Sequence, residues 1–184
     1  GGLIILNLLE KTELPIEGIL LFSPMLELKK DYKGRKNKLI SNVGKISKDT
    51  RFKVGITPHD LTRNDEIIEE TANDGLMLKK VTYSWYNLIN EKMKETMDHI
   101  RDIKPISALI MYGTNDKILE TQSINEMKDK LKSKEMYFKV WDGLYHEIHN
   151  EPERDLVMRY VLSFLNNSVN TMGFIVNEEE IEDI

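Results

Sequence analysis

Three short apolar runs, each ending at a turn signal, are the first regular feature of the chain. They cover residues 16–22, 106–112 and 136–141, and each is followed directly by a serine-proline pair, a glycine or an aspartate-glycine pair. Apolar runs of this length with such boundaries are typical of strands buried in a sheet. The sequence therefore predicts three strands.

Helical patterns fill the segments between and after these strands. Residues 3–11 are almost continuously apolar, apolar side chains recur at helical spacing over residues 121–131, and a further apolar stripe runs from Leu156 to Leu165 after Pro152. Proline favours the first turn of a helix. Strands that alternate with helices indicate an α/β fold with a parallel sheet.

Residues 29–100 interrupt this alternation. They open with a basic run at residues 29–38 and continue as helical patterns, of which the longest spans residues 78–100. Its predicted apolar side carries Leu78, Val81, Trp85, Leu88, Ile89, Met93 and Met97. An insert of this length is too long for a loop, so we predict a helical lid over the carboxyl edge of the sheet.

The chain then divides into a discontinuous core, the lid and a tail. The core comprises residues 1–28 and 101–170, the lid residues 29–100, and an acidic tail residues 171–184. The tail has little apolar surface to bury, which is typical of segments outside a core.

Composition narrows the classes of function. The 184 residues carry a net charge of -5 and no cysteine, which argues against nucleic acid as the main partner and excludes disulfides, thiolate zinc sites and a cysteine nucleophile. No apolar run approaches the ~18 residues that suggest a membrane span. These features favour a cytoplasmic or membrane-peripheral location, and they leave the compartment and the oligomeric state open.

Two ionisable residues follow the predicted strands. Asp116 and His146 lie just past a glycine and are 30 residues apart (146 minus 116). Polar loops after parallel strands carry the chemistry of open α/β sheets, and a carboxylate with an imidazole is the orienting acid and base of a nucleophilic hydrolase. The alternatives are a helix-capping aspartate and a loop histidine beside a helix start.

Nearby residues are assigned other roles. His149 is expected to be structural, and His146 with His149 lacks a third ligand at a spacing that would indicate zinc. Glu151 is expected to anchor the histidine loop or the amino end of the next helix, without a role in proton transfer.

Six stretches resemble, in order, the motifs of one protein family. Gly1-Gly2 is similar to the end of a G-x-S-x-G-G nucleophile elbow, and Ile19 to Pro24 is similar to the strand that follows it. Leu61 to Asn64 and Asn73 to Leu76 are similar to lid motifs, although Gly75 stands where proline is usual. Tyr112 to Asp116 is similar to the catalytic-acid loop, and Gly143 to Glu151 is similar to the catalytic-histidine loop. From Gly1 to about Asn166, the chain resembles the carboxyl-terminal part of an α/β-hydrolase of the monoacylglycerol lipase and lysophospholipase type, also described as serine aminopeptidase S33-like.

This resemblance implies a serine hydrolase. Asp116 and His146 would be the catalytic acid and base, the serine would precede Gly1, and the missing amino-terminal half of the same protein would be a required partner. The implied reaction is hydrolysis of a monoacyl lipid ester, in a lysophospholipid or a monoacylglycerol, through an acyl-serine intermediate and without a cofactor or metal. The alternatives are a related esterase or peptidase and a non-catalytic binding module.

Lipid contacts are predicted at two places. Tyr83, Trp85, Tyr86 and Leu88 are candidates for lining an acyl-chain channel, although helical spacing by itself indicates packing on the core. The basic run at residues 29–38 is a candidate for contact with an anionic membrane surface, with a solvated loop as the alternative.

Overall fold

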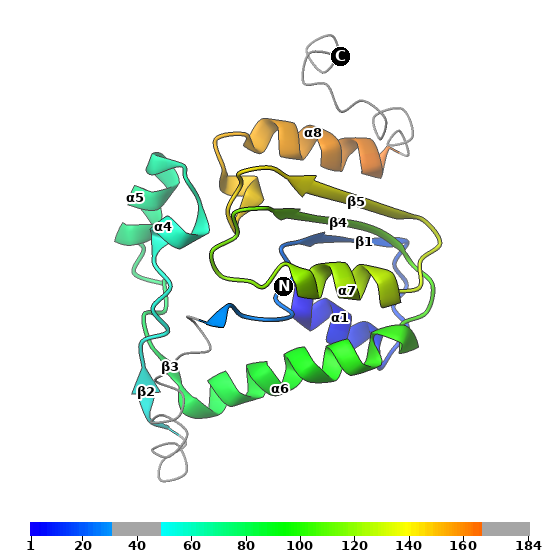
Figure 1. Ribbon diagram of the computed structural model, residues 1–184, viewed down its shortest axis with the longest axis horizontal. Coiled ribbons are helices and arrows are strands. Elements are labelled where there is room, and N and C mark those ends of the chain that lie inside the picture. Colours follow the sequence, from blue (N-terminus) through cyan, green and yellow to red (C-terminus); the bar gives the residue numbers. More distant parts are fainter. Residues whose placement is uncertain (31–48, 167–184) are drawn as a thin grey trace.

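A parallel sheet of three strands forms the centre of the computed structural model, which describes residues 1–30 and 49–166 (Figure 1). The strands are β1 (Gly18–Phe22), β4 (Ser107–Gly113) and β5 (Met136–Trp141), in the order β1-β4-β5. Leu109 of β4 lies opposite Leu20 of β1 and Tyr137 of β5. The three predicted parallel strands are thus confirmed.

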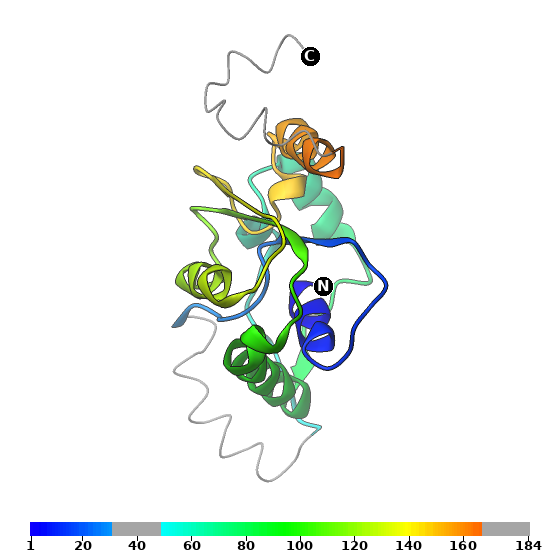
Figure 2. The ribbon, with the colours of Figure 1, turned by 90° about the vertical axis from the view of Figure 1, so that its right-hand side faces the viewer.

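Helices cover both faces of this sheet (Figure 2). They are α1 (Gly2–Leu9), α6 (Tyr83–His99) and α7 (Gln122–Lys130) on one face, and α8 (Arg154–Leu165) on the other. Successive side chains of a strand point to opposite faces. Accordingly, Ala108 and Ile110 of β4 pack with the first three helices, whereas Leu109 and Met111 pack under α8.

The long helix of the predicted lid begins later than expected. Val81–Thr82 forms a short strand, β3, that pairs antiparallel with β2 (Arg51–Phe52). The Thr82 hydroxyl then accepts a hydrogen bond from the Trp85 backbone N–H at 3.2 Å. Threonine is a favoured cap, because its oxygen satisfies an N–H that the first helical turn leaves free. α6 therefore starts at Tyr83 instead of Leu78.

The predicted apolar side of this helix is partly wrong. Tyr86 and Met93 are buried, but Trp85 is 46% exposed and Leu88 49% exposed. Each residue turns a helix by about 100°. Trp85 and Leu88 are thus rotated away from the side that packs on the core.

α6 packs along α1. The Asn7 side-chain amide donates to the Thr96 hydroxyl at 3.2 Å, and Lys11 Nζ lies 2.8 Å from Glu95 Oε1. Hydrogen bonds from Lys11 and Lys92 lower the pKa of Glu95 to about 2. Tyr86 and Met93 of α6 belong to the same hydrophobic cluster as the sheet, although α6 lies within the predicted lid. The division of the chain into core and lid at residues 29 and 100 stays a prediction.

The rest of the described insert lies beyond the strand ends. It contains α4 (Pro58–Leu61) and α5 (Asp65–Asn73), at the side of Figure 1 toward which the strand arrows point. Two 3-10 turns, η1 (Ile100–Asp102) and η2 (Ile148–Asn150), complete the elements. Most of the predicted basic run and the whole predicted acidic tail lie outside the described residues.

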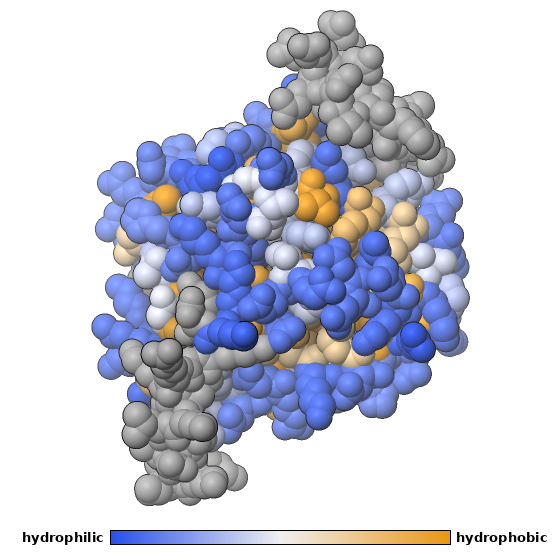
Figure 3. All heavy atoms as spheres, in the orientation of Figure 1, coloured by the Kyte–Doolittle hydropathy of each residue, from blue (hydrophilic) through white to orange (hydrophobic). Residues whose placement is uncertain are grey.

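The molecular surface is mostly polar on the face shown in Figure 3, and its apolar side chains gather over β5, between α7 and α8. β5 is an edge strand, and residues 136–140 are only half-buried. None of the described helices combines the length and apolar composition that a bilayer-spanning helix needs.

Candidate active site

Two loops meet at the carboxyl ends of β4 and β5. The Thr114 backbone N–H donates to Trp141 O at 2.9 Å, and the Asn115 N–H donates to Leu144 O at 3.0 Å. These bonds hold the loop after β4 against the loop after β5.

Gly113 allows this close approach. A Cβ added at Gly113 would lie 2.1 Å from the carbonyl oxygen of Leu144. This distance is far shorter than any non-bonded contact between a carbon and an oxygen atom. The glycine that marks the end of the predicted strand is thus required by the contact between the two loops.

Asp116 and His146 come together at this junction. His146 Nδ1 lies 2.8 Å from Asp116 Oδ2, and Asp116 Oδ1 accepts from the backbone N–H groups of Ile118 at 2.8 Å and Leu119 at 2.9 Å. Asp116 is fully buried, whereas the His146 side chain is 22% exposed. A carboxylate accepts hydrogen bonds, so this contact places the imidazole proton on Nδ1 and leaves Nε2 as an acceptor.

Two lysines that sequence reasoning missed also contact this junction. Lys29 Nζ donates to the backbone carbonyl of Asp116. Lys117 Nζ donates to His59 O at 3.1 Å and lies 4.0 Å from the centre of the Tyr145 ring. Lys29 belongs to the predicted basic run, but its charge is directed to the acid loop. Contacts between such distant residues leave no sequence signal.

Glu151 anchors the histidine loop, as predicted. Its Oε1 accepts from the Tyr145 N–H at 2.7 Å and its Oε2 from Arg63 Nε at 2.9 Å. The side chain is fully buried. The pairing with Arg63 was not predicted.

The His149 ring packs against the ring of Phe22. Its ring centre lies 5.8 Å from that of Phe22, and its Nδ1 is buried without a hydrogen-bond partner among the described residues. Across residues 1–30 and 49–166, no three histidine, aspartate or glutamate side chains cluster as a metal site would require.

The four candidate lipid-contacting residues are not gathered on one side. Tyr86 is buried in the core, with its ring centre 5.4 Å from that of Phe52. Trp85 and Leu88 are exposed on the other side of α6, and Tyr83 is half-buried at its start. Tyr86 is thus a core residue, and the acyl-channel assignment of the other three stays a prediction.

The family described as serine aminopeptidase S33 matches residues 1–153. The chain belongs to this family. The predicted resemblance to the monoacylglycerol lipase and lysophospholipase type is confirmed, because the relatives of this chain include a phospholipase and a monoacylglycerol lipase.

Two curated relatives are similar in sequence. Phospholipase YtpA of Bacillus subtilis is 27% identical over 170 residues, covering 92% of this chain and 66% of the relative. A monoacylglycerol lipase of Mycolicibacterium smegmatis is 35% identical over 57 residues, covering 31% of this chain and 20% of the relative.

The fold is shared with a solved structure. The crystal structure of Paleococcus ferrophilus monoacylglycerol lipase superimposes with a TM-score of 0.80 at 22% identity, covering 91% of this chain and 65% of that protein. The predicted α/β-hydrolase fold is confirmed. The chain thus spans just under two thirds of the length of the phospholipase and of the lipase in this crystal structure.

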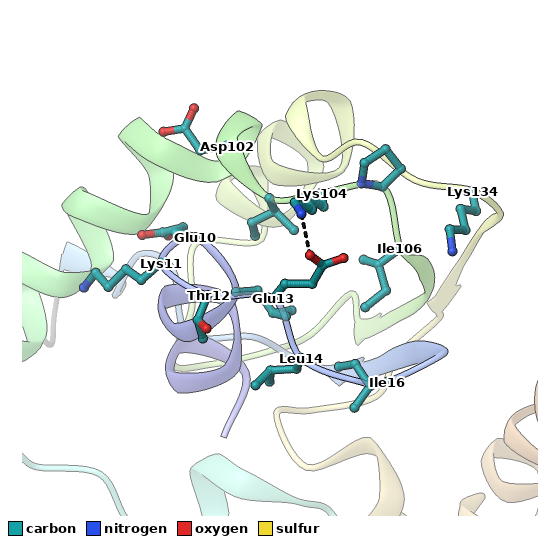
Figure 4. A pocket seen from close by; sticks show the side chains of 13 residues that line it. Glu10, Lys11, Thr12, Glu13, Leu14, Ile16, Asp102, Lys104, Ile106 and Lys134 are labelled. Carbon is teal, nitrogen blue, oxygen red and sulfur yellow. Dashed lines mark hydrogen bonds and ion pairs between the residues drawn. The ribbon is translucent and has the colours of Figure 1, made fainter.

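A cavity of about 240 Å³ lies elsewhere on the chain. Ile16, Ile106 and Lys134, which line it, precede β1, β4 and β5. Figure 4 shows the Glu13 carboxylate turned toward the Lys104 ammonium group across this cavity. The cavity is therefore at the amino ends of the strands, opposite the edge that carries Asp116 and His146.

Proposed function

We propose that this chain carries the general base and the orienting acid of a serine hydrolase that cleaves a carboxylic ester in a monoacyl lipid. The 2.8 Å contact between His146 Nδ1 and the buried Asp116 carboxylate carries the proposal. In this arrangement Nε2 accepts a proton, while Asp116 sets the tautomer and stabilises the imidazolium that forms.

The reaction proceeds through an acyl-serine intermediate. His146 Nε2 takes the hydroxyl proton as the serine oxygen attacks the ester carbonyl, and the proton passes to the departing alcohol as the ester C–O bond breaks. Water then attacks the acyl-serine by the same route, which releases the fatty acid and restores the hydroxyl. No metal or organic cofactor takes part in these steps.

The nucleophile is assigned to a serine that precedes Gly1. This assignment rests on the similarity of Gly1-Gly2 to the end of the family's nucleophile elbow. Among the described residues, no serine hydroxyl is hydrogen-bonded to His146.

The substrate class rests on the curated relatives. One is named a phospholipase and the other a monoacylglycerol lipase. We therefore assign a lipid with one fatty-acyl ester as the substrate class. A monoacylglycerol and a lysophospholipid both have this feature.

The test uses the intact protein with both lipids as substrates. Wild-type protein is expected to hydrolyse them and to be labelled by a serine-reactive fluorophosphonate. His146→Ala is expected to lower kcat by about 10⁴- to 10⁶-fold, as in other triads. His99→Ala is the matched control, because His99 is an exposed residue at the end of α6 that bonds to Asp102.

Each other result has a defined meaning. Unchanged turnover in His146→Ala would refute the base assignment. Labelling with turnover of only short esters or peptides would indicate a related esterase or peptidase. Wild-type protein with neither labelling nor turnover would indicate a non-catalytic binding module.

A further inference from the structure

The backbone is held on both sides of His146. The N–H of Tyr145, the preceding residue, donates to Glu151 Oε1 at 2.7 Å. The N–H of Glu147, the following residue, donates to the carbonyl of Leu61 at 2.8 Å. Both neighbours of the imidazole are therefore fixed by partners outside their own turn.

These partners lead to one segment of the insert, residues 61–63, which runs from the last residue of α4 toward α5. The Thr62 hydroxyl donates to Asn150 O at 2.9 Å. The backbone N–H and Nε of Arg63 both donate to Glu151 Oε2, at 3.2 and 2.9 Å. All three residues of the 61–63 segment thus bond to the loop that carries His146.

Glu151 joins the two parts through one carboxylate. Its Oε1 faces the histidine loop and its Oε2 faces Arg63, and the side chain is fully buried. A buried carboxylate that loses its cationic partner is strongly disfavoured, because neither water nor another charge replaces the lost interaction. Removing the Arg63 guanidinium would therefore disturb the carboxylate that holds the residue next to His146.

The charge and geometry of the Arg63 guanidinium suit it to hold the Glu151 carboxylate. Its side chain is 35% exposed, and a second bond runs from its guanidinium to the more exposed Glu153. Burial lowers the pKa of Arg63, but the bonds and charges of Glu153 and Glu151 outweigh this effect and raise the pKa above its ordinary value. The guanidinium is thus permanently charged, and its planar fork matches a carboxylate in a way that the lysine ammonium does not.

We propose that Arg63 and Glu151 are positioning residues that hold His146 in hydrogen-bonding geometry with Asp116, so that turnover depends on the placement of the insert. This inference rests on the proposed function, in which His146 is the base. Displacing a catalytic group by about 1 Å can cost about 100-fold in rate. Movement of the 61–63 segment would be transmitted through one carboxylate to the residue beside the imidazole.

The experiment compares matched variants of the intact protein on the monoacyl lipid ester. Arg63→Ala and Glu151→Gln are expected to lower kcat by about 100-fold and to leave KM within about threefold. Arg154→Ala is the control, since the Arg154 side chain is exposed and lies 3.9 Å from exposed Asp155, away from Glu151 and Arg63 in the described ion pairs. It is expected to keep kcat within about twofold.

Chemical rescue separates positioning from general stabilisation. Millimolar guanidinium is expected to restore part of the kcat of Arg63→Ala, because it can occupy the vacated site beside Glu151, while sodium chloride at equal ionic strength should not. Arg63→Lys is expected to fall between wild type and Arg63→Ala, since it keeps the charge without the fork. Thermal melting verifies that each variant is folded at the assay temperature.

The failure of this inference is distinguishable from failure of the proposed function. If His146→Ala abolishes turnover but Arg63→Ala retains its kcat, positioning is refuted and the base assignment stands. Loss of kcat that follows loss of folded protein, without rescue by guanidinium, also refutes positioning. Wild-type protein without ester turnover refutes both.

Discussion

The two oxygens of Asp116 have separate partners, and this fixes what an amide would do there. Oδ1 accepts two backbone N–H bonds, from Ile118 and Leu119, and Oδ2 faces His146 Nδ1. In Asp116→Asn, the amide oxygen would keep the backbone bonds, so its NH₂ would face Nδ1. The imidazole proton would then move to Nε2, where it blocks proton acceptance from the serine.

We therefore expect Asp116→Asn to lower kcat/KM by about 10⁴-fold while the protein stays folded. Steady-state hydrolysis and circular dichroism test the two parts. Asp142→Asn is the control, because Asp142 is an exposed aspartate in the neighbouring loop that accepts a bond from the Thr114 hydroxyl. Equal activity in Asp116→Asn and wild type would contradict the tautomer argument.

α6 shows how a helix presents two different faces to the rest of the protein. Tyr86 packs edge-on against Phe52 in the core, whereas its neighbour Trp85 is half-exposed. We expect Tyr86→Ala to lower the free energy of unfolding by about 3–5 kcal/mol, because it leaves a cavity in the core. Trp85→Ala should lower it by about 1 kcal/mol or less.

Urea unfolding of the two variants measures this difference directly. Both changes remove a large aromatic side chain from the first turns of α6, so helix propensity affects them similarly. A larger loss in Trp85→Ala than in Tyr86→Ala would mean that the helix packs on the side predicted from its sequence.

At the scale of the whole molecule, the candidate site combines the loop after β4, the loop after β5 and a segment of the insert. Under the proposed function, substrates with one long acyl chain are expected to be preferred over short soluble esters. Each buried methylene contributes about 0.8 kcal/mol, which corresponds to about a fourfold gain in kcat/KM. The gain should continue with chain length until the predicted acyl-chain channel is full.

A series of esters from acetyl to palmitoyl, assayed below their aggregation limits, tests this expectation. A flat profile would contradict the lipase interpretation and leave a general esterase.

Much of the core was predictable because its signals are local. Apolar runs that end at turn residues indicated β1, β4 and β5, and the polar loops after them indicated Asp116 and His146. A parallel sheet brings the carboxyl ends of neighbouring strands to one edge. The meeting of these two side chains therefore followed from strand order.

Other features depended on contacts between distant parts of the chain. Which side of α6 is buried was decided by α1 and the sheet, because periodicity gives an apolar stripe without naming the surface that covers it. Arg63 and Glu151 are 88 residues apart, and Lys29 bonds to a backbone carbonyl that any residue at position 116 would offer. Such pairings leave no local pattern, since only the tertiary structure brings the partners together.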